Sequence, residues 1–173
     1  MINHNTCYVS LGESSFIQNY FDNVDKNTLQ YGEYFGFNMS LVSEDLYLQE
    51  PVLKEVNDKH KIKGCSIIKL DPYHCYVWHK DALRGAGINL LLTPNVKSSV
   101  FFGMPIERSQ DQVHFAEMKY EPNTLYLFNT QIMHTVYNFD EPRYLFSVEF
   151  EQSKDELSFY NLKGGALLPF ISE

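Results

Sequence analysis

Between residues 64 and 151 the chain is a series of short apolar runs separated by turn residues, with no helical spacing. The gaps are rich in Asp, Asn, Gly and Pro, as in Asp71-Pro72 and Glu121-Pro122-Asn123. Several short strands at this spacing predict a β-sandwich or barrel, and eight antiparallel strands suit a jelly roll of two sheets. The eight runs are Gly64–Leu70, Tyr73–Trp78, Gly87–Thr93, Ser98–Met104, Val113–Tyr120, Thr124–Phe128, Ile132–Asn138 and Arg143–Glu151.

The residues before and after these runs have a different pattern. Apolar residues of 13–24 form one helical stripe, with Ser14 or Ser15 as N-cap, and 43–60 suggests a second helix that Pro51 breaks near its middle. Residues 153–163 suggest a short helix before Gly164-Gly165. We therefore expect one mainly β domain over 1–173. Its double-stranded β-helix (a cupin-like jelly roll) spans about 64–151, with N-terminal helical support over 1–63 and a C-terminal tail over 152–173.

Composition excludes several classes of protein. A net charge of −8 and a pI near 5.2 argue against direct nucleic-acid binding, because phosphate contacts need clustered Lys and Arg. The three cysteines lack C-x-x-C spacing, so we expect buried free thiols rather than a disulfide framework or a zinc site. No signal peptide and no apolar run of membrane-spanning length is visible, so we expect a soluble, cytoplasmic protein.

Residues that could bind a metal ion or an anion occur in three of the predicted strands or at their ends. His79 and Asp81 form an H-x-D triplet at the end of the second run, and an extended segment points residues i and i+2 to the same side. His134 lies in the seventh run, and Arg143 begins the eighth. Two histidines and one carboxylate can occupy one face of an octahedral metal and leave three positions open. So short a motif also recurs by chance among ordinary surface residues.

This arrangement resembles the Fe(II)/2-oxoglutarate-dependent oxygenases. The resemblance covers about residues 64–151 and implies that His79, Asp81 and His134 bind Fe(II). It also implies that Arg143 pairs with the distal carboxylate of the cosubstrate 2-oxoglutarate, and a guanidinium fork suits that task. The alternative for Arg143 is a structural salt bridge to Asp140 or Glu141.

The likeness is closest to the aspartyl/asparaginyl β-hydroxylase-like branch. His79, Arg84 and INLLLTP match one of its motifs, and HTVYNFDEPRYLFSVEF matches another. The chain departs from that branch at Asp81, where its best-known members have glycine. It also departs at Leu145, where many relatives have the serine of Arg-x-Ser, and the nearest serine here is Ser147.

Three further residues are candidates with an open alternative. Arg84 and Asn89 could contact the substrate or the cosubstrate, or could cap the loop after Asp81. Ser147 shares the face of Arg143 by strand alternation and could help to hold the cosubstrate or fill the core.

We consider three functions. The leading hypothesis is a dioxygenase (a hydroxylase) that forms succinate and CO2 while oxidising a small molecule or a protein side chain. The alternatives are a cupin-like metalloenzyme that does not use 2-oxoglutarate and a non-catalytic jelly-roll binding module. The sequence names neither the substrate nor the oligomeric state.

Overall fold

The computed structural model describes residues 3–14, 16–34, 37–105 and 113–171. Its elements are, in order, α1 (His4–Cys7), β1 (Tyr8–Glu13), α2 (Ile17–Asn23), β2 (Gly32–Tyr34), β3 (Phe37–Val42), α3 (Glu44–Tyr47), α4 (Pro51–Lys59), β4 (Ile62–Leu70), β5 (Cys75–His79), β6 (Gly87–Leu91), β7 (Ser98–Pro105), β8 (Val113–Met118), β9 (Thr124–Phe128), β10 (Met133–Asn138), β11 (Arg143–Phe150), α5 (Phe159–Gly164) and the 3₁₀ turn η1 (Leu168–Phe170).

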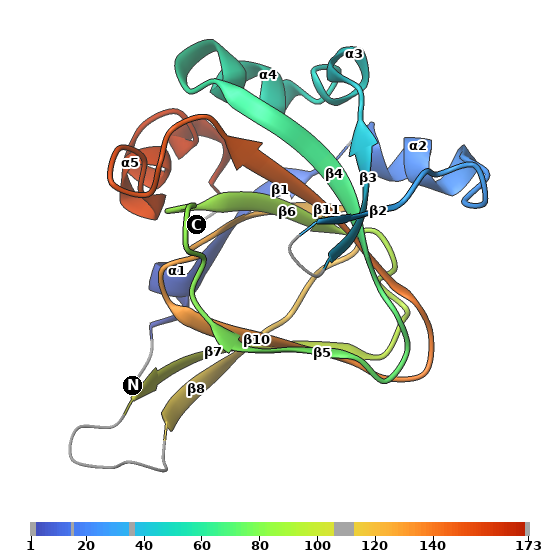
Figure 1. Ribbon diagram of the computed structural model, residues 1–173. Helices are drawn as coiled ribbons and strands as arrows, with labels where there is room; N and C mark the ends of the chain where they lie inside the picture. The colour runs from blue at the N-terminus through green and yellow to red at the C-terminus, as the bar shows by residue number, and fades with distance from the viewer. Residues whose placement is uncertain (1–2, 15, 35–36, 106–112, 172–173) are drawn as a thin grey trace.

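The described strands form two antiparallel sheets that face each other (Figure 1). The large sheet has the order β1-β9-β6-β11-β4-β3-β2, and the small sheet has the order β5-β10-β7-β8. The eight runs predicted from the sequence are β4 to β11. Four of them lie in each sheet, which is the double-stranded β-helix that the sequence predicts.

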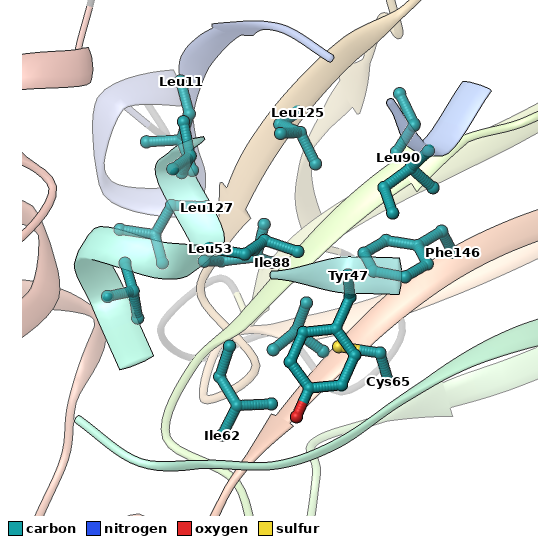
Figure 2. Packing of buried hydrophobic residues seen from close by; sticks show 14 of the residues in the cluster. Leu11, Tyr47, Leu53, Ile62, Cys65, Ile88, Leu90, Leu125, Leu127 and Phe146 are labelled. Atoms are coloured by element: carbon teal, nitrogen blue, oxygen red, sulfur yellow. The ribbon is translucent and has the colours of Figure 1, made fainter. Parts of the chain in front are cut away.

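Side-chain alternation gives the large sheet two different faces. On its outer face Ile88, Leu90 and Phe146 pack with Leu53 of α4 in the main hydrophobic cluster (Figure 2). On its inner face Tyr126 and Phe128 pack with residues of the small sheet in a second, smaller cluster. The inner face also carries Asn89, Arg143 and Ser147, so polar groups lie between the two sheets.

The N-terminal third supports the large sheet with strands as well as helices. β1 pairs with β9, and β3 pairs with β4. Because Glu13 is the last residue of β1, α2 begins at Ile17 instead of residue 13. The N-cap residue of α2 is Phe16 and not Ser14, although the Ser14 hydroxyl accepts the Ile17 N–H at 3.3 Å. Ser15 lies outside the described residues. Pro51 does divide the segment 43–60. It begins α4, where the N–H that proline lacks would have no helical partner.

The cysteines differ in part from the expectation. Cys7 and Cys65 are buried free thiols, but Cys75 is exposed, because its strand β5 forms an edge of the small sheet. Cys65 lies on β4 of the other sheet. In the described part of the chain, no helix has the length and apolar character needed to cross a membrane.

Candidate metal centre

The two histidines are brought together by strand pairing. His79 ends β5 and lies directly opposite His134 of β10, with the centroids of the two rings 4.3 Å apart. Asp81 follows two residues after His79, and its Oδ1 lies 3.7 Å from the Nε2 atom of each histidine. The three candidate ligand atoms lie within 4.8 Å of one another. The three residues predicted to bind metal therefore converge on one point.

Backbone carbonyls fix the orientation of both imidazole rings. Nδ1 of His79 lies 2.7 Å from the Val77 carbonyl oxygen, and Nδ1 of His134 lies 2.9 Å from that of Ile132. A neutral ring whose Nδ1–H donates to a carbonyl has an unprotonated Nε2, and this assignment of the proton follows from the hydrogen bond. Both Nε2 lone pairs are then available on the side where Asp81 lies. Metal-binding histidines are commonly held in this way.

His134 is protected from protonation by its surroundings. It is buried among aromatic residues, with the Phe128 ring centroid 5.0 Å away and that of Phe102 6.1 Å away. Burial lowers the pKa of His134 to about 4, and nearby His79 acts in the same direction. The Ile132 carbonyl and Asp81 act in the opposite direction. At neutral pH this imidazole is uncharged and able to bind a metal.

Arg84 holds the carboxylate of Asp81. Its Nε and Nη2 donate to Oδ2 of Asp81 at 2.8 and 2.6 Å, which leaves Oδ1 for the histidine side. The third nitrogen, Nη1, donates to the Ser147 hydroxyl at 3.2 Å. The Asp81 N–H donates to the Thr130 carbonyl oxygen, and the Gln131 amide donates to the Asp81 carbonyl oxygen. The loop that carries Asp81 is therefore tied to the turn between β9 and β10.

Arg143 lies on the inner face of β11 and is almost completely buried, at 2% exposure. Its Nε has no hydrogen-bond partner, and Asn89 has an unpartnered Oδ1. Both residues line a cavity of about 70 Å³ that Asp81 and His134 also line. Burial lowers the pKa of the guanidinium, but arginine remains charged in proteins. In the described residues Arg143 forms no salt bridge to Asp140 or Glu141, so a buried cation faces the metal cluster across a small cavity.

Two tyrosines of this cavity were missed by the sequence interpretation. The ring of Tyr120 lies 5.8 Å from the guanidinium carbon of Arg143, and Tyr76 also lines the cavity. Burial raises the pKa of both hydroxyls, that of Tyr76 to about 12, so they are neutral at pH 7. Tyr76 was missed because β5 bulges between Tyr76 and His79 and turns both inward, which simple alternation from His79 does not predict. Tyr120 follows β8 and belongs to no motif.

The donor set fits a divalent iron ion, because two imidazoles and one carboxylate converge with open space beside them. The Arg143 guanidinium hydrogen-bonds Tyr120, but its Nε is unpartnered and no anion of the described residues pairs with it, so an organic anion in the same cavity would fit. A molecule that bears a carboxylate and reaches from Arg143 to the metal cluster would satisfy both ends.

No known protein-family model matches the sequence, and no curated protein matches it. Solved structures do match. A 2OG-Fe(II) oxygenase family oxidoreductase from Burkholderia pseudomallei has 12% identity and a TM-score of 0.57, over 90% of this chain and 88% of that one. A prolyl-4-hydroxylase from Pseudomonas putida has 15% identity and a TM-score of 0.53, over 79% and 84%.

The alpha-ketoglutarate-dependent carbocyclase SnoK of nogalamycin biosynthesis has 9% identity and a TM-score of 0.55, over 84% of this chain and 78% of that one. At such identities the likeness concerns the backbone and not the reaction. This chain has the jelly-roll fold found in structures of 2OG-Fe(II) oxygenases.

Proposed function

We propose that this protein is a non-haem Fe(II) oxygenase that uses 2-oxoglutarate and hydroxylates its substrate, forming succinate and CO2. One observation carries the proposal: the convergent donors of His79, Asp81 and His134 share a cavity with the buried, unpartnered Nε of Arg143. The fold is consistent with it. The branch related to aspartyl/asparaginyl β-hydroxylases stays a prediction that rests on the sequence motifs.

In this proposal Nε2 of His79, Nε2 of His134 and Oδ1 of Asp81 hold the iron. When bound, Fe(II) supplies the activation of O2 that couples oxidative decarboxylation of the 2-oxo acid to hydroxylation of a substrate C–H bond. Arg84 keeps Asp81 oriented by occupying Oδ2. Phe102 and Phe128 exclude water from His134, which keeps its ring neutral.

Arg143 binds the distal carboxylate of 2-oxoglutarate in this proposal. Its guanidinium can donate two parallel N–H bonds to a carboxylate, and its burial removes the competition from water. The Asn89 side chain lines the same cavity and is a second polar contact for the cosubstrate. The Ser147 hydroxyl accepts a hydrogen bond from Arg84, and its own proton is available to donate to the cosubstrate.

Neither of the two alternative functions requires a buried arginine at position 143. A cupin-like metalloenzyme that does not use 2-oxoglutarate needs the three ligands but no buried guanidinium beside them. A binding module without catalysis needs neither. The guanidinium is hydrogen-bonded to Tyr120, but its Nε is unpartnered and the described residues provide no anion to pair with its charge. Burying a charge without an opposite charge is costly, so a function that uses this charge explains the structure better.

The proposal is tested by adding Fe(II) and 2-oxoglutarate to the metal-free protein under anaerobic conditions. We expect the weak visible absorption of metal-to-ligand charge transfer. His134→Ala should abolish it, whereas His114→Ala should preserve it, because His114 is an exposed residue of β8. Absence of the band from the folded parent, or an equal band in His134→Ala, would refute the proposal.

A further inference from the structure

A second, larger cavity lies against the same cluster. It has a volume of about 320 Å³ and is lined by His79 and Asp81, but not by Arg143. Ligand pockets in proteins measure roughly 300–1,000 Å³, so this one suits a small molecule or a single side chain. Met39 of β3 contributes to its wall, and β3 is one of the strands that this chain adds to the eight of the jelly roll. We call it the outer cavity.

The charged groups of the outer cavity are already paired. Asp81 is bound to Arg84 through Oδ2 at 2.6 Å and has Oδ1 3.7 Å from both histidines, and Glu149 is bound to Lys63 at 2.9 Å. Among the described residues that line the cavity, no other Asp, Glu, Lys or Arg is present. A charged substrate group would lose hydration on entry and find no free opposite charge, which disfavours it.

The remaining walls are mainly apolar, with one available hydroxyl. Met39, Ile68 and Leu83 provide hydrocarbon surface. Ser66 lies beside Ser147 in the register of β4 and β11, and both line the cavity. The Ser147 hydroxyl accepts from Arg84 and is assigned to the cosubstrate in the proposed function, whereas that of Ser66 makes no hydrogen bond to any described residue. The cavity therefore offers apolar contact and one neutral hydrogen-bonding group.

We propose that the outer cavity binds an uncharged, largely aliphatic group with one hydrogen-bonding function, which places a C–H bond beside His79 and Asp81. This assignment of the substrate class rests on the proposed function. The reaction would convert the C–H bond, 2-oxoglutarate and O2 into the corresponding alcohol, succinate and CO2. Leu83 and Met39 contact the aliphatic part, and the Ser66 hydroxyl contacts the polar function.

The test compares hexanamide, hexylamine and hexanoate, which have the same carbon chain and charges of 0, +1 and −1 at pH 7. Binding is measured by ligand-observed NMR titration of the metal-free protein, with no 2-oxoglutarate present. We expect hexanamide to bind about tenfold more tightly than either charged probe, since only the charged groups lose strong hydration. Equal or tighter binding of hexylamine or hexanoate would overturn the proposal.

Two lysine substitutions make the test specific to this cavity. Leu83 lines it and is 62% exposed, while Leu168 lies in η1 outside it and is 61% exposed, so the chain should tolerate both changes equally. We expect Leu83→Lys to weaken hexanamide about tenfold and to strengthen hexanoate, because it adds an unpaired cation. Leu168→Lys should bind as the parent does. The same response in both variants would refute the site.

The outcome is independent of the iron chemistry. Hexanamide binding without a charge-transfer band would leave the outer cavity standing and refute the proposed oxygenase. A normal charge-transfer band together with tighter binding of a charged probe would support the proposed oxygenase and refute the proposed substrate class. Succinate release with each bound probe then reports whether occupation of the cavity stimulates turnover.

Discussion

Replacing Arg143 with methionine is expected to change stability and cosubstrate binding in opposite directions. Without cosubstrate, the guanidinium is 2% exposed and its Nε has no partner. Exchange of a buried charged group for an apolar residue of similar volume is often neutral or stabilising by about 1–4 kcal/mol. The contact with the Tyr120 ring at 5.8 Å offsets part of this gain. We expect Arg143→Met to raise the free energy of unfolding by about 1–2 kcal/mol.

Cosubstrate binding should respond the other way. Truncating one partner of a buried charge pair costs about 2–5 kcal/mol, which corresponds to a roughly 30- to 5,000-fold weaker affinity for 2-oxoglutarate. Arg143→Lys should recover only part of the loss, because an ammonium cannot donate the two parallel bonds of a guanidinium. Fe(II) affinity should stay nearly unchanged, since Arg143 is not among the three candidate ligands.

Three measurements on the same variants check this reasoning. Denaturant unfolding of the metal-free protein gives the stability, Fe(II) titration gives metal affinity, and 2-oxoglutarate dependence of succinate formation gives the cosubstrate KM. If Arg143→Met used 2-oxoglutarate as well as the parent, the assigned role of Arg143 would be wrong. A clear loss of stability in the metal-free variant would show that the guanidinium stabilises the fold by itself.

Other predictions concern the loop that carries Asp81 and the dependence of stability on pH. Arg84→Met should weaken Fe(II) affinity by roughly 10- to 100-fold, as loss of a group that orients a metal ligand usually does, and metal titration checks this. In the metal-free protein burial lowers the pKa of His134 from 6.5 to about 4, so protonation favours the unfolded chain as pH falls through this window. The parent should therefore lose about 2 kcal/mol more stability than His134→Gln between pH 7 and pH 5, measured in the presence of a chelator. Gly85→Ala should lower the free energy of unfolding by about 1–3 kcal/mol, measured with denaturant. A methyl group at Gly85 would overlap with the Leu157 carbonyl and displace the C-terminal tail from the loop that carries Asp81. Gly64→Ala, which meets no atom within 4 Å, is the matched control and should stay within about 0.5 kcal/mol of the parent.

The sequence by itself determined the eight strands of the jelly roll. Buried strands such as β6 and β9 are apolar over nearly their whole length, and turn residues separate them, so each can be recognised locally. The added strands β1 and β3 were not recognised. Each forms by pairing with the edge of a sheet that has to exist first, and short segments of mixed polarity do not record that partner.

The same division holds for the candidate metal centre. Alternation places His79 and Asp81 on one side of a strand end, so the sequence predicts two of the three candidate ligands from local geometry. The position of His134 opposite His79 depends on the pairing of β10 with β5 across 55 residues of sequence, which only the tertiary structure decides.

Tertiary structure also decided which polar residues meet. The bulge in β5 turned Tyr76 inward, Arg84 paired with Asp81, and Tyr120 came to lie beside Arg143. The physical reason is that a side chain's direction along one strand is a local property of the backbone. Its neighbours across the two sheets depend on register, bulges and packing between segments far apart in the chain.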